Sequence, residues 1–493
     1  MTTTNRKSVT ICLNRSRIWR WQVELVERLA RHRDVYPVVR LIDGPHAPRT
    51  FRLLLELEKL VFRLHGEHAC DLLGENVLES YHETPGAGDN GRVLDLTGQD
   101  VTGIRSDISV RYDGSVSDDA ALLAVLEGRS PALSIVSGAD RVMMSGLSAV
   151  EDRTVATRAL DNVFSALLQL CEKAATAPMT SGSQSSVPPV PARDMHAGKF
   201  LAFGAAALKD KLNTRIAKFC RRAPNWFVAW RQMHDPDATI SLPGIAAYQR
   251  LADDGGRYYA DPFPIVVDGK MHLFVEEYDM SLGKGLISVS MLTSGGFERP
   301  KPVLETPYHL SYPHVFEHEG TIWMIPESLQ SRTVDLYRAT SFPGGWVHEA
   351  TLLQDIEASD ATICRHGGLW WMFAATRSWL GSNWDTLSVF WASELTGPWQ
   401  PHAGNPILVD HRCARPAGEF FRRDGALWRP VQDCSDGYGS GLAFCRIDAL
   451  DLQSVRQSVQ STVRLRDGKV QRGPHSMNRA GGIEVIDLYG APL

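Results

Sequence analysis

The stretch Ala260-Asp261-Pro262-Phe263-Pro264-Ile265-Val266-Val267-Asp268-Gly269, followed by the apolar run KMHLF (270–274), decides the fold because its pattern returns four more times. Each copy is a ten-residue window that ends on a glycine and precedes an apolar strand. The other windows are SYPHVFEHEG (311–320), SDATICRHGG (359–368), PAGEFFRRDG (416–425) and GPHSMNRAGG (473–482). Glycine tolerates the positive φ that a tight hairpin turn requires, so each copy predicts two neighbouring strands joined by a turn.

The residues between the copies supply further strands, such as 286–291, 333–338 and 387–391. Each repeat therefore contains about four strands, and copies spaced by roughly fifty residues are typical of a repeat architecture. Four-stranded units arranged around an axis form a β-propeller, which leaves only short sheet edges exposed. We predict an all-β, five-bladed propeller over residues 224–493.

The N-terminal part has a different pattern, and we predict one α/β, Rossmann-like domain over residues 6–175. A β-rich run at 8–13, a helical pattern at 19–31 and a second β-rich run at 35–42 give a β-α-β opening. This order resembles the Rossmann-like domain of formyltransferases. No His-x-Ser-Leu-Leu-Pro stretch and no GxGxxG loop occurs here, so no catalytic or dinucleotide-binding residue is assigned to this domain.

Two segments connect the predicted domains. Residues 176–193 are rich in Ser, Pro, Thr and Ala, which predicts a flexible linker. Residues 194–223 are predicted to form a basic amphipathic helix, with leucines and phenylalanines near one side and lysines and arginines opposite. Such a helix either packs against the propeller or lies at a membrane surface, where anionic lipid attracts the basic side.

Composition restricts the classes of function. The net charge of −5 argues against a nucleic-acid-binding protein. The eight cysteines contain no CxxC pair, which argues against a disulfide framework and a zinc site. The sequence contains no signal-peptide pattern and no apolar run of about eighteen residues, so we expect a cytoplasmic protein, with peripheral contact at the inner face of the membrane through the basic helix.

Polar residues recur where the first strand of each repeat begins. In propellers these strands line the central channel, so their side chains converge on one mouth of it. We interpret Asp261, Asp360 and Glu419 as candidate catalytic residues. The candidates for substrate binding are Glu276, Tyr312, His314, Glu327, Arg377, Arg415, Arg429, Gln432 and His475.

Alternative interpretations stay open for these residues. An Asp before Pro can satisfy backbone amides in a turn, so Asp261 also has a structural interpretation. Arg415 and Arg429 would be bidentate partners for a phosphate if the substrate is a nucleotide or a phospholipid. No cofactor or metal site is recognisable from the sequence, although Asp and His side chains at a channel mouth could hold a divalent cation.

The Asp-Pro pair, the Asp-Gly turn and the aromatic-rich strand after it resemble the five-bladed propellers of arabinanase- and β-xylosidase-type glycoside hydrolases. That resemblance implies a general base at Asp261, with Asp360 and Glu419 as the best matches to the orienting Asp and the general acid. Two carboxylates serve this chemistry because one handles the proton of the leaving oxygen while the other activates the acceptor.

A closer resemblance is to the propeller region of plant glucosamine inositolphosphorylceramide transferases. The segments ADPFPIVVDG, SYPHVFEHEG and ASDATI carry it. In the plant proteins a separate glycosyltransferase domain carries the transfer, so the resemblance implies glycan or glycolipid biosynthesis as a setting. We therefore expect a sugar-transferring enzyme that acts on a saccharide, sugar nucleotide or glycolipid. The alternatives are an intracellular glycoside hydrolase or phosphorylase, and a non-catalytic glycan-binding scaffold.

Overall fold

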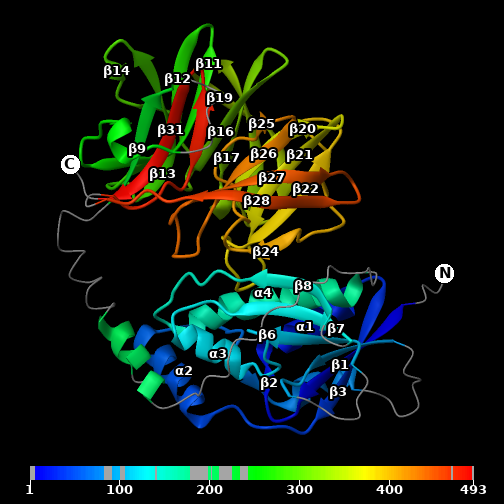
Figure 1. Cartoon of the computed structure of the whole chain (residues 1–493). Coiled ribbons are helices and arrows are strands. Elements are labelled where there is room, and N and C mark those ends of the chain that lie inside the picture. Colours follow the sequence, from blue (N-terminus) through cyan, green and yellow to red (C-terminus); the bar gives the residue numbers. More distant parts are fainter. Residues whose placement is uncertain are drawn as a thin grey trace. The chain divides into compact units, whose positions relative to one another are not determined.

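A computed structural model describes residues 6–82, 91–99, 106–138, 141–177, 198–200, 202–209, 225–233, 242–467 and 470–490 (Figure 1). The chain forms two compact units, Met1–Ile216 with Ser378–Ser382, and Ala217–Arg377 with Asn383–Leu493. Most of the predicted linker (176–193) and of the predicted basic helix (194–223) lies outside the described residues. Within the second of these segments, residues 198–200 and 202–209 are described and are helical.

The first unit is built on a mixed sheet whose strands follow the order β8-β7-β6-β5-β1-β3. The pairs β3–β1, β1–β5 and β5–β6 are parallel, and β6–β7 and β7–β8 are antiparallel. These strands are β1 (Lys7–Asn14), β3 (Val35–Ile42), β5 (Arg92–Leu96), β6 (Ile108–Tyr112), β7 (Ala132–Ser137) and β8 (Arg141–Leu147), and the short β2 (Ile18–Trp19) pairs with β4 (Leu72–Leu73). Helix α1 (Arg20–Arg31) connects β1 to β3, as the β-α-β pattern predicts.

Helix α4 (Ala156–Thr176) is the central helix of this unit. It contacts α1, α2 (Arg49–Phe62) and α3 (Asp119–Leu126) as well as β7 and β8, and it is buried along most of its length. A helix surrounded in this way needs apolar residues on nearly every side, which its Ala- and Leu-rich sequence supplies. The likeness of this unit to formyltransferases stays a prediction.

The second unit contains the five predicted hairpins. They are β11–β12 (Arg257–Val267, Lys270–Asp279), β16–β17 (Ser311–His318, Thr321–Glu327), β20–β21 (Ala358–His366, Leu369–Thr376), β25–β26 (Phe421–Arg423, Ala426–Gln432) and β30–β31 (Met477–Ala480, Ile483–Gly490). The two central residues of every turn have φ between 49° and 82°, the type I′ geometry that suits a two-residue hairpin. The hairpin prediction is confirmed.

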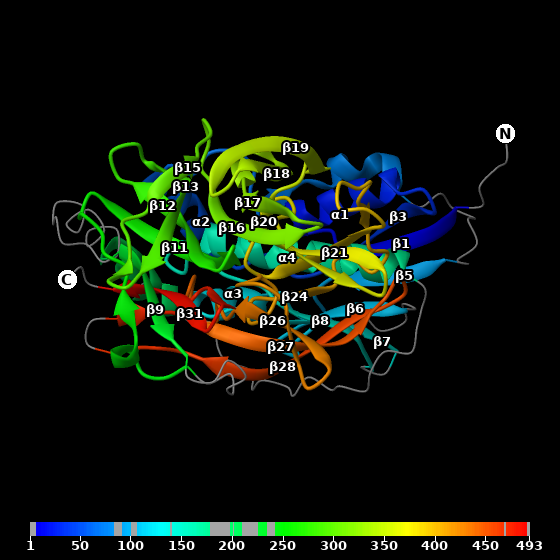
Figure 2. The same cartoon turned by 90° about the horizontal axis from the view of Figure 1, so that it is seen from above.

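Further strands extend each hairpin outwards. They are β13 (Lys284–Thr293), β14 (Gly296–Phe297) and β15 (Lys301–Leu304), β18 (Thr333–Ser341) and β19 (Gly344–Gln354), β22 (Thr386–Ala392), β23 (Gln400–Pro401) and β24 (Leu408–Asp410), β27 (Leu442–Leu450) and β28 (Val455–Val463), and β9 (Asn225–Gln232), β10 (Gln249–Arg250) and β29 (Val470–Arg472). Strand β9 pairs with β31, so the first and last strands of the unit lie side by side (Figures 1 and 2). The sheets have a propeller-like arrangement (Figure 2), and the count of five blades stays a prediction.

The turn glycines allow a direct test of the hairpin geometry. Gly320 has φ of 72°, and a Cβ added there would meet nothing within 4 Å, so Gly320→Ala carries a backbone penalty without a clash. We expect it to lower the free energy of unfolding by about 1–2 kcal/mol. Gly244→Ala is the control, because φ of −60° suits alanine and the space is equally open. Urea unfolding followed by tryptophan fluorescence compares the two, and equal stabilities would contradict the prediction.

Candidate functional site

Three of the predicted site residues share one backbone feature. Asp261, Tyr312 and Asp360 lie where the first strand of a hairpin shifts register against the second. Their φ angles are 48°, 44° and 54°, values that residues other than glycine rarely adopt. A bulge of this kind redirects a side chain out of the normal strand alternation, and such strained positions concentrate at functional sites. All three side chains are buried.

Asp360 belongs to a buried ionic cluster. Arg415 donates from Nε to Asp360 Oδ2 at 2.5 Å and lies 3.4 Å from Glu327 Oε2 through Nη2. Gln432 Nε2 donates to the same Asp360 oxygen at 3.0 Å, and the Asp360 backbone N–H donates to Glu327 at 3.1 Å. The structure thus brings together four predicted residues from three hairpins and the loop before the fourth.

Asp261 belongs to a second cluster, with His475 and Asp487. His475 Nδ1 lies 2.6 Å from Asp487 Oδ2, and His475 Nε2 lies 3.3 Å from Asp261 Oδ1. The Asp261 backbone N–H donates to Asp487 Oδ2 at 2.9 Å, and Tyr312 N–H donates to Asp261 Oδ2 at 3.2 Å. Asp487 was missed in the sequence. The available signal was an acidic residue flanked by the apolar Ile486 and Leu488 in IEVIDLYG (483–490).

The charges of this cluster are strongly coupled. Burial holds the pKa of Asp261 well above its ordinary value; the imidazole of His475 opposes this effect, and the carboxylate of Asp487 reinforces it. Burial alone would lower the pKa of His475, but the carboxylates of Asp487 and Asp261 outweigh it and raise that pKa to about 9. Burial acts against ionisation of Asp487 too, but His475 and backbone N–H groups bring its pKa below the ordinary value. A protonated His475 therefore lies between the carboxyl groups of Asp487 and Asp261, and it favours the ionised form of each.

These charge effects act on two of the predicted roles. A general base must be unprotonated to accept a proton, and the burial that raises the pKa of Asp261 acts against that role. Asp261, His475 and Asp487 also form a group that could hold a metal ion, with ligand atoms within 4.8 Å of one another. Because imidazole ligates a metal only when neutral, a divalent cation would have to displace the proton of His475.

Glu419 is the most accessible carboxylate of the predicted set. Its side chain keeps 36% exposure, whereas its neighbour His314 is buried, with Nε2 4.0 Å from Glu419 Oε1. Surrounding protein atoms raise the pKa of Glu419 to about 8 and lower that of His314 to about 3. At neutral pH Glu419 therefore carries a proton in a position that solvent reaches.

A short hydrogen-bond path connects Glu419 to the first hairpin. The Glu419 N–H donates to Asn478 Oδ1 at 2.8 Å, and Asn478 Nδ2 donates to the carbonyl of Pro262 at 2.8 Å. Gly418 permits this approach, because a Cβ there would lie 2.1 Å from the carbonyl oxygen of Met477. Asn478 thus fixes Glu419 beside the bulge that carries Asp261.

Glu276 lies in the same electrostatic environment. Its Oε1 is 3.3 Å from His309 Nε2. Burial, reinforced by the nearby carboxylates of Glu327, Asp487 and Asp360, raises the pKa of Glu276 to about 8. Burial and the charge of Asp360 likewise raise the pKa of Glu327 to about 8, against the opposing charge of Arg415. The site therefore contains several carboxyl groups that hold protons near neutral pH.

Aromatic side chains lie beside these clusters. The ring of Trp226 lies 4.3 Å from that of His475 at an interplanar angle of 31°, and Tyr438 lies 5.3 Å from the same imidazole. The guanidinium of Arg415 lies 5.1 Å from the Tyr438 ring centroid, and Trp384 lies 5.5 Å from Tyr438. Sequence reasoning did not select Trp226 or Tyr438, because aromatic residues are common throughout this unit.

Two predicted arginines lie in other surroundings. Arg429 is buried and donates to the carbonyls of Cys413 and Ala414 and to Gln457 Oε1, so its guanidinium holds the chain together. The prediction that it binds a phosphate stays a prediction. Arg377 pairs with Glu357, with Nη1 3.8 Å from Oε2. Tyr312 has a structural contact as well, because its hydroxyl bonds Thr362 Oγ1 at 2.9 Å.

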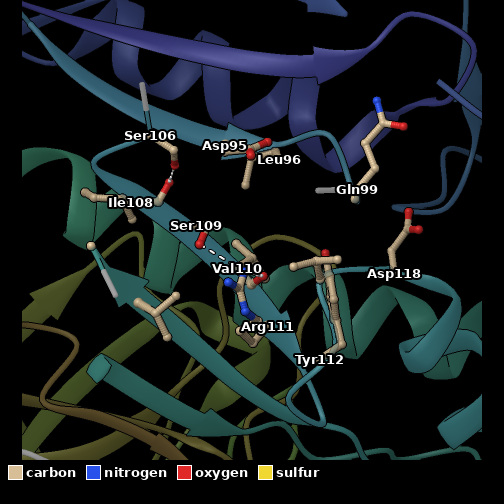
Figure 3. A pocket seen from close by; sticks show the side chains of 14 residues that line it. Asp95, Leu96, Gln99, Ser106, Ile108, Ser109, Val110, Arg111, Tyr112 and Asp118 are labelled. Carbon is tan, nitrogen blue, oxygen red and sulfur yellow. Dashed lines mark hydrogen bonds between the residues drawn. The ribbon is translucent and has the colours of Figure 1, made fainter. Parts of the chain in front are cut away.

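The first unit contains a cavity of about 230 Å³ (Figure 3). It lies beside the carboxyl ends of the parallel strands β5 and β6. In these two strands Leu94 pairs with Ile108 and Asp95 pairs with Ser109. Ligands of open α/β sheets commonly bind at such ends. Arg111 donates to Ser109 Oγ at 3.0 Å in its wall. The remaining lining residues are Asp95, Leu96, Gly98, Gln99, Ser106, Ile108, Val110, Tyr112, Val116, Asp118, Val136 and Gly138.

Comparison with known proteins relates the second unit to one family. Residues 245–489 match the family described as Glucosamine inositolphosphorylceramide transferase 1, N-terminal. The chain is 35% identical over 262 residues to Glucosamine inositolphosphorylceramide transferase 1 of Oryza sativa subsp. japonica. The aligned residues cover 52% of this chain and 34% of the rice protein. The protein of the same name from Arabidopsis thaliana is 33% identical over 205 residues, with coverage of 41% and 27%. This chain thus spans between about a quarter and a third of the length of these curated relatives.

Solved structures of glycoside hydrolases are also similar to this chain. A thermostable family-43 glycoside hydrolase aligns with a TM-score of 0.32 and 18% identity, over 44% of this chain and 78% of that protein. A family 117 glycoside hydrolase from Zobellia galactanivorans aligns with a TM-score of 0.35 and 12% identity, over 54% and 91%.

The family match contains both ionic clusters. The interval 245–489 extends from before Asp261 to beyond Asp487, and it includes Glu419 with its partner Asn478. Trp226 lies outside it, as does the whole of the first unit up to Ile216.

Proposed function

We propose that this protein is a carbohydrate-active enzyme that transfers a sugar during assembly of a cell-surface glycan or glycolipid. The five hairpin groups form the five blades of its propeller, and the site lies at the mouth of the central channel. The reaction takes place in the cytoplasm, on a saccharide, sugar-nucleotide or glycolipid substrate. The name of the relatives, glucosamine inositolphosphorylceramide transferase, supports a sugar-transferring activity.

The observation that carries this proposal is the pairing of unlike carboxyl groups in one region. Glu419 holds a proton and is accessible, whereas Asp487 is ionised and buried. Making or breaking a glycosidic bond passes through an oxocarbenium-like state, in which an acid serves the leaving oxygen and negative charge stabilises the sugar ring. Glu419 is the proposed acid, and the buried clusters of Asp261 and Asp360 supply the electrostatic field.

The remaining residues have supporting roles in this proposal. Arg415 orients Asp360 and Glu327 while balancing their charge. Trp226, Tyr438 and Trp384 would form an apolar wall for a sugar ring, since carbon-bound hydrogens of sugars pack on aromatic faces. The first unit, proposed to be formyltransferase-like, would position a partner or a second substrate.

A ligand screen tests the proposed function. Sugars and sugar nucleotides are added to the full chain, and melting temperatures are measured. A ligand present at a hundred times its Kd should stabilise the wild type by about 2.7 kcal/mol. Asp261→Asn should lose this shift while it stays folded, because asparagine keeps the size of the side chain but cannot carry the charge that Asp261 shares with His475 and Asp487.

Asp424→Asn is the matched control, since Asp424 is an exposed turn residue that shares the positive φ of Asp261. It should keep the full ligand-induced shift. The absence of any stabilising sugar, or an equal shift in Asp261→Asn and wild type, would refute the proposed site.

A further inference from the structure

Helix α2 of the first unit exposes a row of large apolar side chains. Leu53 is 60% exposed, Leu57 49%, Leu60 76% and Val61 40%. These positions are spaced by three or four residues along Arg49–Phe62, so they share one side of the helix. We call Leu53, Leu57, Leu60 and Val61 the α2 stripe. It crosses more than two turns of one helix, whereas scattered single exposed leucines are ordinary on protein surfaces.

The opposite side of α2 is fixed to the unit. Phe51 and Leu55 are buried there, and the buried Glu58 accepts hydrogen bonds from the N–H groups of Ala156 and Thr157 at 2.8 Å each. These contacts hold α2 on the first turn of α4, where the helix dipole favours a carboxylate. Because the buried side is bonded in this way, the helix cannot rotate to bury the α2 stripe without breaking them.

Basic residues lie along one edge of the α2 stripe. Arg49 and Arg52 are exposed, and at 100° per residue they fall in the arc next to Leu60. The exposed Arg63 follows as the C-cap residue of the helix. Lys59 lies on the same edge and pairs with Asp71 at 2.9 Å and with Glu56 at 3.3 Å. The edge and the C-terminal end of α2 therefore carry four cations, beside the exposed carboxylate of Glu56.

We propose that α2 binds the surface of an anionic lipid bilayer, with the α2 stripe inserted between the head groups and the arginines on lipid phosphates. An apolar arc with a basic flank is the arrangement by which interfacial helices combine apolar burial with attraction for anionic lipid. Charge complementarity selects this partner, because a neutral surface would leave the arginines unpaired. None of the helices among the described residues is long and apolar enough to cross a bilayer, and α2 itself has 14 residues. It lies along the surface.

A second described segment of the same unit has similar character. In the helical stretch 202–209, Leu208 is 58% exposed and is followed by the exposed Lys209, whereas Phe203 and Ala207 are buried. It belongs to the region predicted from the sequence to contact a membrane. The proposal for α2 does not depend on it or on sugar transfer.

Vesicle flotation tests the proposal on the full chain. Wild type should float with vesicles of phosphatidylcholine containing phosphatidylglycerol, and much less with phosphatidylcholine alone. The triple variant Leu53→Asn, Leu57→Asn, Leu60→Asn should lower the partition coefficient on anionic vesicles at least about tenfold. The double variant Arg52→Gln, Arg63→Gln should lower the partition coefficient on anionic vesicles about tenfold. Its weak binding to phosphatidylcholine alone should change little.

The matched control replaces exposed apolar residues of the second unit, Met280→Asn, Leu282→Asn and Leu452→Asn. It should float like the wild type, and circular dichroism checks that every variant is folded. The proposal is overturned if wild type does not float, if it floats equally on neutral and anionic vesicles, or if the triple variant floats unchanged. It is overturned as well if the triple variant changes only the mass measured by light scattering, which would assign the α2 stripe to a protein contact.

Discussion

Replacing Arg415 by methionine is expected to lower the free energy of unfolding at pH 7 by about 3–5 kcal/mol, the cost of removing one partner of a buried ion pair. Arg415 is buried and faces two buried carboxyl groups, at 2.5 Å from Asp360 and 3.4 Å from Glu327. Burial acts against its charge, yet the carboxylates of Asp360 and Glu327, together with Tyr438, hold the pKa of Arg415 well above its ordinary value. Methionine fills a similar volume without charge, so the loss would be electrostatic.

Arg412→Met is the matched control for this experiment. Arg412 lies three residues earlier and forms an ion pair with Asp410 at 2.7 Å, but its side chain is 56% exposed. Exposed pairs contribute about 0–1 kcal/mol, so its unfolding should change little. For a unit of this size, the Arg415 variant should melt roughly 10 °C lower. If both variants unfold like the wild type, the ion pairs of the Asp360 cluster do not contribute to the free energy of unfolding.

Much of the second unit follows from local sequence chemistry. A turn of two residues with positive φ selects glycine at its second position, so Gly269, Gly320, Gly368, Gly425 and Gly482 identify five hairpins without any knowledge of tertiary structure. The β-α-β opening of the first unit is equally local, because the period changes from two to 3.6 residues between β1 and α1. The blade count depends on how hairpins join into sheets, which no local pattern determines.

The candidate site could be predicted only in part. Asp261 and Asp360 were selected because they occupy the same position of the repeat, and Glu419 because it lies at the start of the fourth copy; the structure places Asp261 and Asp360 near other acidic groups and Glu419 beside His314. The bulges that redirect Asp261 and Asp360 are register shifts between two strands, so a single strand does not reveal them. Asp487 was missed because its role depends on pairing with His475, twelve residues earlier.

Arg429 shows another limit of sequence reasoning. A buried arginine can serve a ligand or the chain itself, and the sequence around it, LWRPV, does not distinguish these uses. In the fold, β26 places its guanidinium against the carbonyls of Cys413 and Ala414. Such backbone acceptors come from a distant loop, so only the tertiary structure shows that the arginine has a structural role.

Glu419→Gln is expected to lower the rate of sugar transfer about 10²–10⁴-fold, the usual contribution of a positioned general acid. Glutamine preserves the shape of the side chain but has no acidic proton to give. Substrate binding should persist, because the backbone N–H that bonds Asn478 is unchanged. The assay measures nucleotide release from a sugar nucleotide that passes the ligand screen. Glu319→Gln, with a side chain 82% exposed, is the control and should keep the full rate.

The pH dependence distinguishes this role from a structural one. Desolvation by the surrounding protein atoms raises the pKa of Glu419 from 4.5 to about 8, so the folded protein holds a proton that the unfolded chain releases. Its contribution to stability is therefore present below pH 4.5 and is lost as the pH rises through about 8. A rate that needs the protonated form should fall on the same alkaline limb, about tenfold per pH unit. Glu419→Gln has no group that titrates near pH 8, so its pH–rate profile should lose the alkaline limb. If the variant keeps this limb, the proton belongs to Glu276 or Glu327, whose pKa values are raised to about 8 as well.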